Sequence, residues 1–421
     1  MTTDILSFIL ILSVLLFGAV EIWSSTIIIL MVYTLGLAWI IRKEYTRFKP
    51  SGAEKLLYAT GAAFAVYTII QVLPLPASLL EFISPNAFDL RSFYSLDGSK
   101  DFMYISVHPY KTRLELLRVL AFLTVLFISM QAFRDIDNVT RTLKILVVFG
   151  FCLAVFGILQ KVTWNGKIYW LRELTFPSAS PFGPFVNRNH FAGFIGMLIP
   201  LGLGLLLTAR ERPKKILFGF LTLIMALSVF FSLSRGGIIG FFLGVALFSI
   251  LIIQSRAHTR RVWVIGIFLV ALAAYLLYLG IDPIVDRFYN SDVSTNDRLI
   301  VWSATLNAFK DFWLTGSGLG TFMDLFPMYS PVGIQAVFVH AHNDYIEFML
   351  ETGAIGIILL ITFISLSIYI MAKSVPGENR GILRIAAVSS VFTMMIHSFV
   401  DFNLHILSNA LLFFAIFGII R

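Results

Sequence analysis

The chain of 421 residues is 58% hydrophobic and 13% charged, and its mean hydropathy is +0.86. This composition excludes a soluble globular domain and is typical of an all-α polytopic membrane protein. A net charge of +8 in such a chain is usually a topology signal of the loops, so we expect no nucleic-acid partner. The single cysteine, Cys152, lies in an apolar run and excludes a disulfide framework.

Apolar runs predict twelve membrane-spanning helices, which together form one integral membrane domain over residues 1–421. The first run lacks a preceding basic segment, so we interpret it as a span and not as a cleavable signal peptide. The expected spans are 5–22, 24–41, 56–73, 114–133, 143–161, 190–208, 215–232, 236–254, 262–280, 343–371, 383–401 and 404–420.

Basic residues follow every even-numbered span. The groups begin at Arg42, Arg134, Arg210, Arg256 and Lys373, and Arg421 ends the last span. Because cytoplasmic loops carry an excess of Lys and Arg, we expect these exits and both termini on the cytoplasmic side. The outer side then holds three sizeable loops, at 74–113, 162–189 and 281–342.

The start of the tenth span combines polar and apolar character. His342 lies where the chain enters the membrane, and Asp344, Glu347 and Glu351 fall on the first turns of the same helix. A carboxylate facing lipid would cost about 2.5–3.5 kcal/mol, so we expect these to face a wet or paired interior. Gly353 is expected to let another helix approach closely. A histidine near a helix N-terminus is favoured as the neutral, proton-accepting form, so we predict a catalytic His342; the alternative is an ordinary interface histidine.

Three arginines on the outer side call for a reason, because basic residues are under-represented there. They are Arg188 before span six, Arg235 in a short turn between spans seven and eight, and Arg298 in the longest loop. Guanidinium groups bind phosphate oxygens bidentately, so we predict a diphosphate-binding set. The alternatives are a turn or headgroup-contacting role for Arg235 and a solvated loop charge paired with Asp297 or Asp292 for Arg298, with a similar alternative for Arg188.

Three further polar residues of the outer side are predicted to support the site. Asn343 follows the predicted catalytic histidine, and Asp401 and His405 lie near the outer end of span eleven. They are expected either to orient the centre or to satisfy a helix terminus. We predict no metal, because His340 and His342 do not share a helix face and no HExxH or cysteine partner is present.

These motifs resemble the O-antigen ligase family, which shares a superfamily with the Wzy-type polysaccharide polymerases. The sequence His342-Asn343, nine further residues and Gly353 matches the family's pattern of His, a small polar residue, nine residues and Gly. SRGG around Arg235 is similar to the family's outer arginine turn, and DRLIVW around Arg298 with the following LTGSGLGTF is similar to a segment of its large loop. FGPFVNRNHFAG and HSFVDFNLH are also typical of related sequences. The resemblance covers roughly residues 180–410 and does not separate ligase from polymerase.

The resemblance implies a GT-C-like fold with a periplasmic loop subdomain, 281–342, between helices nine and ten. It implies a metal-independent glycosyltransferase of the bacterial inner membrane, without cofactor, whose site faces the periplasm. The donor would be a glycan on undecaprenyl diphosphate. The acceptor saccharide would be lipid A–core in a ligase or the growing glycan in a polymerase.

The chemistry of the residues agrees with these implications. Arginines can neutralise a diphosphate leaving group, His342 can take the acceptor proton, and direct displacement would invert the anomeric carbon. The non-enzyme alternative is a carrier of lipid-linked glycan or solute, which would need polar or broken helices near the midplane and often an inverted repeat. The polar groups here gather at the outer rim and the sequence shows no repeat, so we favour the enzyme.

Overall fold

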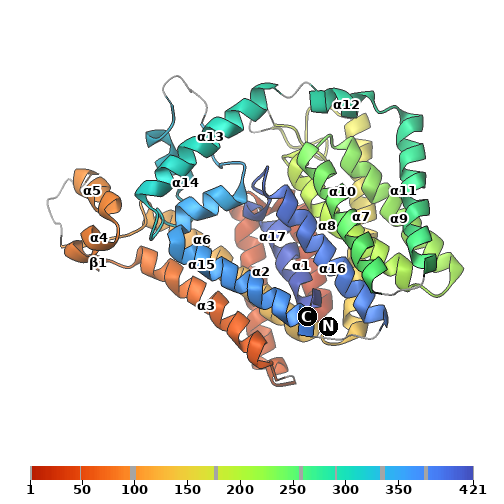
Figure 1. The fold of residues 1–421 in the computed structure, drawn as a ribbon, viewed down its shortest axis with the longest axis horizontal. Helices are drawn as coiled ribbons and strands as arrows, with labels where there is room; N and C mark the ends of the chain where they lie inside the picture. The colour runs from red at the N-terminus through yellow and green to blue at the C-terminus, as the bar shows by residue number, and fades with distance from the viewer. Residues whose placement is uncertain are drawn as a thin grey trace.

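A computed structural model describes residues 2–47, 49–94, 101–174, 179–255, 259–289, 292–331, 337–373 and 378–420 (Figure 1). The described chain is helical, apart from two short antiparallel strands, β1 (Leu75–Pro76) and β2 (Phe102–Met103), and two isolated bridges. The first eight α-helices are α1 (Thr2–Leu15), α2 (Ile22–Ile41), α3 (Gly52–Val72), α4 (Ala77–Ile83), α5 (Pro85–Tyr94), α6 (Pro109–Ala132), α7 (Ile136–Val162) and α8 (Arg188–Thr208). Those that follow are α9 (Arg212–Phe231), α10 (Arg235–Gln254), α11 (Thr259–Leu279), α12 (Asp282–Tyr289), α13 (Asp292–Asp311), α14 (Phe322–Leu325), α15 (Asp344–Lys373), α16 (Glu378–His397) and α17 (Leu407–Ile420).

Each of the twelve predicted spans overlaps an α-helix, although α1 ends at Leu15, α16 ends at His397 and α17 begins at Leu407. Within the described ranges, eight helices are long and apolar enough to cross a bilayer: α2, α3, α6, α7, α8, α9, α10 and α15. The apolar parts of α1, α11 and α17 are shorter. An all-α polytopic membrane protein is therefore confirmed, while twelve crossings stay a prediction.

Local sequence sets several helix starts. Ser51 and Glu54 form a reciprocal capping box at the start of α3, in which the Glu54 carboxylate accepts from the Ser51 backbone N–H at 2.6 Å. Ser234 caps α10, because its hydroxyl accepts from the Gly237 N–H at 3.2 Å. Pro109 opens α6, where its missing N–H costs nothing.

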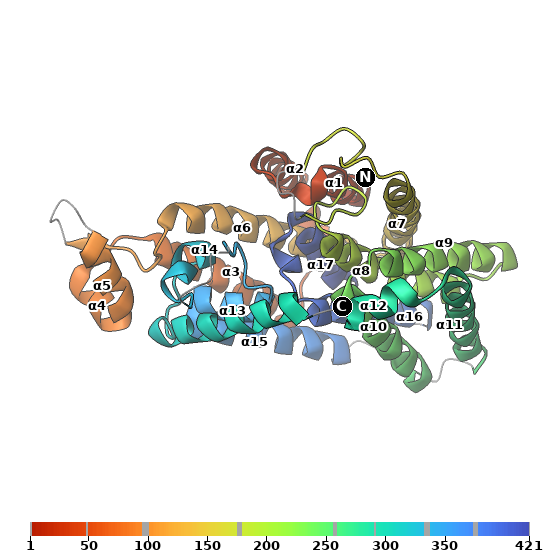
Figure 2. The ribbon, with the colours of Figure 1, turned by 90° about the horizontal axis from the view of Figure 1, so that it is seen from above.

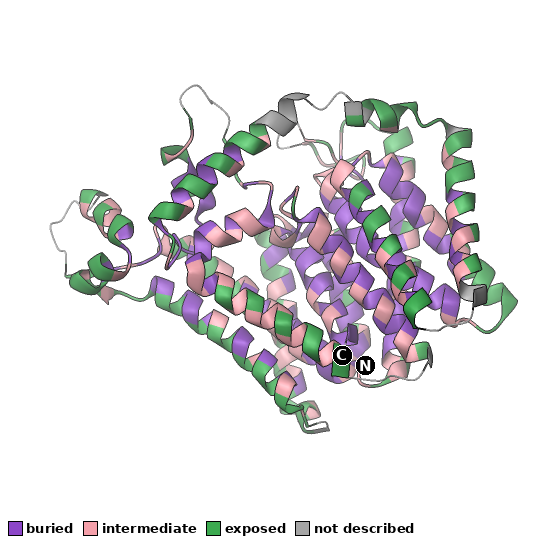
Figure 3. Cartoon of the chain, in the orientation of Figure 1, coloured by how far each residue is buried: buried purple, intermediate pink, exposed green. Residues whose placement is uncertain are grey.

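Helix α8 is the centre of the bundle. It packs against α7, α9, α10 and α16, and nearly all of it is buried (Figures 2 and 3). Close packing depends on its glycines: a Cβ at Gly202 would lie 2.3 Å from the Thr222 hydroxyl of α9. In contrast, α11 lies at one edge and is largely exposed (Figure 3).

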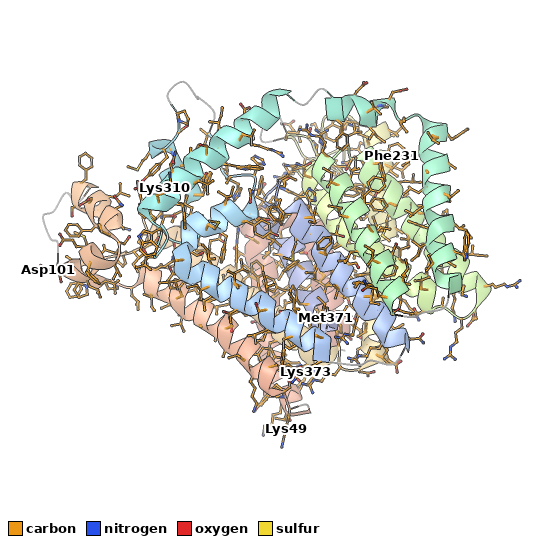
Figure 4. All side chains as sticks on the ribbon, viewed as in Figure 1. Lys49, Asp101, Phe231, Lys310, Met371 and Lys373 are labelled. Carbon is orange, nitrogen blue, oxygen red and sulfur yellow. The ribbon has the colours of Figure 1, made fainter. Side chains whose placement is uncertain are left out.

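The two ends of the bundle differ. Both chain ends lie at its lower end in Figure 1, and the labelled Lys49 and Lys373 lie there too in Figure 4. The loops after spans two and ten are thus on the same side as the termini. Phe231, the last residue of α9, lies at the upper end, where α12 and α13 also lie (Figures 1 and 4).

The outer segments build a second apolar core beside the main bundle. Leu80 of α4 and Ala87 of α5 share it with Val301 of α13, Phe322 of α14 and Leu350 of α15. The sequence predicted one subdomain from residues 281–342 alone. In the structure, the described part of that loop packs together with the first outer loop.

Helix α15 is interrupted at Gly353, which has φ +61° and ψ −165°. The glycine-rich segment 313–320 inserts there: the Ala354 N–H donates to the Trp313 carbonyl at 2.7 Å, and the Gly318 N–H donates to the Glu351 carbonyl at 3.0 Å. The expectation that Gly353 faces another helix is therefore wrong. It faces a loop, whose backbone pairs with groups that the broken helix leaves open.

Candidate active site

The segment between α16 and α17, residues 398–406, contacts the other parts of the site and is called the hub below. The Asp344 N–H donates to the carbonyls of Ser398 at 3.0 Å and Asp401 at 3.3 Å, which ties the start of α15 to it. Phe402 in this segment contacts three imidazoles, with ring centroids 4.3 Å from His340, 4.9 Å from His342 and 4.8 Å from His190. The starts of α8 and α15 and the end of α16 therefore meet around one aromatic ring.

His342 and Asp401 face one another across this junction. Nδ1 of His342 lies 3.6 Å from Oδ1 of Asp401, a charge contact that is longer than a normal hydrogen bond. The His342 side chain is 29% exposed, while that of Asp401 is 1% exposed. The buried carboxylate can thus hold one imidazole nitrogen while the ring stays reachable from outside.

The environment of Asp401 keeps its carboxyl group ionised. Burial alone would raise its pKa, but the imidazoles of His342, His190 and His397 lower the pKa below its ordinary value. His190 Nε2 lies 4.0 Å from Oδ1 of Asp401. An ionised partner favours the His342 tautomer whose Nδ1–H points toward it and leaves the lone pair on Nε2.

Two of the three predicted arginines reach this hub. Nη1 of Arg298, on α13, donates to the carbonyl of Val400 at 2.8 Å. Arg235 is the first residue of α10, and a Cβ at the next residue, Gly236, would lie 2.6 Å from the His397 ring and 2.7 Å from Val400. The chain thus brings the Arg298 side chain and the backbone of Arg235 next to the segment that carries Asp401, while a diphosphate-binding role for these arginines stays a prediction.

Arg188 lies in the same region, at the start of α8. It is the first residue of that helix, its N–H donates to the Ser180 carbonyl at 2.7 Å, and His190 follows two residues later. It is partly buried. The helix start is thus placed against the hub by His190 and Phe402.

Asn343 has a local structural function. Its Oδ1 accepts from the backbone N–H groups of Tyr345 at 3.0 Å and Ile346 at 3.1 Å, so it caps the start of α15. Asn403 also serves packing, because its Oδ1 accepts from the Asn409 amide at 3.0 Å.

A second polar cluster lies beside the first and was not foreseen as a unit. Glu347 Oε1 is 2.7 Å from Nδ1 of His340 and 3.3 Å from Nε2 of His405, whose Nδ1 contacts Asp344 at 2.8 Å. His405 thus bridges two carboxylates. Burial alone would lower the pKa of His405, but Glu347 and Asp344 raise it to about 10.

The same cluster has the residue types and the spacing that could hold a metal ion. The ligand atoms of His340, Glu347 and His405 lie within 4.8 Å of one another. The sequence carried no spacing signal for this set, because the three residues come from a loop, a helix and a separate turn. Each of the three is already engaged in a hydrogen bond or charge contact with another member of the cluster.

The fold and site define a class: a helical membrane protein with a histidine–aspartate pair and arginines gathered at one end of the bundle. Residues 220–361 match the family described as O-antigen ligase, which confirms the resemblance. The match covers about a third of the chain and includes Arg235, Arg298, His342 and Asn343. It ends before Asp401 and His405 and begins after Arg188. No curated protein matches the chain.

Proposed function

We propose that the protein is an inverting, metal-independent glycosyltransferase on a GT-C-like membrane scaffold. It transfers a glycan from undecaprenyl diphosphate to an acceptor sugar hydroxyl, as an O-antigen ligase, at the periplasmic face of the bacterial inner membrane. Both termini are cytoplasmic. The positive-inside pattern supports this orientation: Lys49 and Lys373 lie with both termini at the lower end of the bundle, and α16, which begins near that end, runs away from it toward the site (Figures 1 and 4).

The observation that carries the proposal is the pairing of His342 with Asp401. The carboxylate holds Nδ1, so Nε2 serves as the general base. Nε2 takes the proton of the acceptor hydroxyl, the hydroxyl oxygen bonds to the anomeric carbon, and the bond from that carbon to the diphosphate oxygen breaks. The leaving electron pair stays on the diphosphate.

The arginines have the complementary task. Arg298 and Arg235 lie next to the same segment that carries Asp401, which puts fixed positive charge within reach of a diphosphate at the hub. Fixed cations stabilise charge that develops in the transition state without reorganisation, so they substitute for the metal used by many other transferases. Arg188 completes the set from α8.

A reconstituted reaction tests the proposal. Purified protein in nanodiscs would receive an undecaprenyl-diphosphate oligosaccharide together with either lipid A–core or a second lipid-linked unit as acceptor. We expect a new glycosidic product, whose mass identifies the acceptor and so separates ligase from polymerase. His342→Ala is expected to lower turnover by about 10²–10⁴-fold while the protein stays folded. Near-normal turnover in this variant would disprove the catalytic assignment, and transport of donor without a product would favour the carrier.

A further inference from the structure

The peptide groups on both sides of Ala341 are held by two side chains from different helices. The Ala341 N–H donates to Oε2 of Glu347 at 2.7 Å. The Ala341 carbonyl accepts from Nε1 of Trp302, on α13, at 2.9 Å. Ala341 itself is fully buried. The residue immediately before the predicted catalytic histidine is thus fixed at its donor and at its acceptor.

His342 needs such a constraint. Its φ is +52°, in the left-handed region, which costs roughly 1–2 kcal/mol for a residue with a Cβ. A conformation of this kind persists only when the surrounding structure determines it. On the other side of His342, Asn343 caps α15, so both neighbours are anchored while the imidazole is left to face Asp401.

Glu347 is itself held in place. Its Oε1 contacts His340 at 2.7 Å and His405 at 3.3 Å, and its side chain is 2% exposed. The carboxylate therefore has partners at both oxygens and little freedom to rotate. A helix, a loop and the turn before α17 all converge on this one group.

From these contacts we infer that Glu347 is a positioning residue: together with Trp302 it clamps the Ala341 peptide and so aims the His342 imidazole at Asp401 and the acceptor hydroxyl. The inference rests on the proposed function. It assigns Glu347 no contact with the substrate, since its oxygens are used by Ala341, His340 and His405. Misplacement of a catalytic group by about 1 Å can cost about 10²-fold in rate.

The test compares Glu347→Ala and Glu347→Gln in the reconstituted transfer reaction. Glu347→Ala is expected to lower kcat about 10²-fold with the KM for the lipid-linked donor changed by less than about 2-fold. Glu347→Gln keeps an oxygen acceptor for the Ala341 N–H, so it should recover most of the lost kcat. The matched control is Glu54→Gln, an equally buried carboxylate at the opposite end of the bundle, which should lower thermal stability and leave kcat unchanged.

Trp302→Phe keeps the inference testable if Glu347→Ala does not fold. It removes only the donor to the Ala341 carbonyl, and we expect a loss of kcat of about 10-fold at unchanged donor KM. If Glu347→Ala, Glu347→Gln and Trp302→Phe all lower the Tm but leave kcat unchanged, Glu347 and Trp302 have a merely structural role, which overturns the inference. A folded Glu347→Ala protein with full kcat would do the same. Either result leaves the proposed function intact, because that function is tested separately by the transfer product of the native protein and by the activity of His342→Ala.

Discussion

Nδ1 of His342 faces Oδ1 of Asp401 at 3.6 Å, although the two residues belong to different helix junctions of the chain. The contact is long for a hydrogen bond, as is common for catalytic pairs without substrate. It is built by the backbone: the Asp344 N–H reaches the carbonyls of Ser398 and Asp401 and fixes the spacing of the two segments. The spacing of the two backbone segments that carry the pair is therefore set by the fold.

The pair predicts a large effect of Asp401→Asn. The amide has nearly the shape of the carboxylate but carries no charge, so it no longer favours the His342 tautomer with Nδ1–H and a free Nε2. We expect kcat to fall about 10²-fold or more, with the donor KM little changed. Steady-state kinetics on the nanodisc protein measures this. If Asp401→Asn keeps full kcat, the carboxylate does not orient the base.

The arginines predict a different kinetic signature. Arg298→Lys keeps a positive charge but loses the planar group that donates to the Val400 carbonyl, and Arg298→Ala loses both. Removing a fixed cation from the leaving-group side should cost about 10²–10³-fold in kcat/KM, with Lys intermediate. Arg91→Lys is the control, because Arg91 lies on α5, away from the site, and also donates to a backbone carbonyl, that of Ser106. The control should keep its kcat/KM, and an Arg298→Ala protein with native kcat/KM would refute the assignment.

Much of the fold could be predicted from the sequence, because membrane helices are long apolar runs bounded by charge. The tenth span was expected from residue 343, and α15 begins at Asp344. The segments around His342, Arg298 and Asp401 were also recognised, since basic and ionisable residues are rare at the outer rim. Their contacts were not predictable: the sequence offered Asp297, Asp292 or a diphosphate as the partner of Arg298, and its guanidinium donates to the Val400 carbonyl in the structure.

The hydrogen bonds of Glu347 and Trp302 to Ala341, and the break of α15 at Gly353, depend on contacts between distant segments. Glu347 was expected to face a paired interior, but its partners, Ala341, His340 and His405, follow from the turn of the chain around Phe402. Gly353 was recognised as a motif residue, but the need for glycine at this position comes from the loop that inserts into the broken helix. Spacing along one helix cannot reveal a partner from another segment.

The break in α15 predicts that Gly353→Ala is severely destabilising. A Cβ there would lie 2.5 Å from both the Gly316 amide nitrogen and the Leu314 carbonyl oxygen, at a positive φ. Backbone atoms cannot move aside as a flexible side chain does, so the cost should exceed the roughly 1–3 kcal/mol of this glycine-specific backbone conformation alone. We expect a lower yield of monodisperse protein and a Tm reduced by several degrees.

The matched control for that prediction is Gly266→Ala on α11. A Cβ at Gly266 meets nothing within 4 Å, and alanine favours the helix by about 1 kcal/mol. Its Tm should be unchanged or slightly higher. If both variants behave alike, the inserted loop does not require glycine.

The cluster of His340, Glu347 and His405 predicts the response to a chelator. Because Oε1 of Glu347 already contacts both imidazoles and Nδ1 of His405 contacts Asp344, the set is satisfied without an ion. We expect EDTA, and subsequent addition of Zn²⁺ or Mn²⁺, to change turnover by less than about 2-fold, since metal-dependent centres lose activity when the ion is removed. Elemental analysis of the purified protein is the second measurement. A stoichiometric metal with EDTA-sensitive turnover would contradict metal-independent transfer.

The raised pKa of His405 predicts a pH-dependent contribution to stability. The pKa in the folded protein is about 10, against about 6.5 for a free imidazole, because Glu347 and Asp344 stabilise the cation. The stabilisation is therefore fully present below about pH 6.5 and is lost as the pH rises through about 10. His405→Gln lacks it at every pH. The difference in Tm between the native protein and His405→Gln should be largest near pH 6.5 and shrink toward pH 10, as followed by thermal unfolding in nanodiscs. Lys55→Gln, at an exposed position of α3, controls for the general effect of pH. A Tm difference that stays constant from pH 6.5 to 10 would show that His405 is not the cation between the two carboxylates.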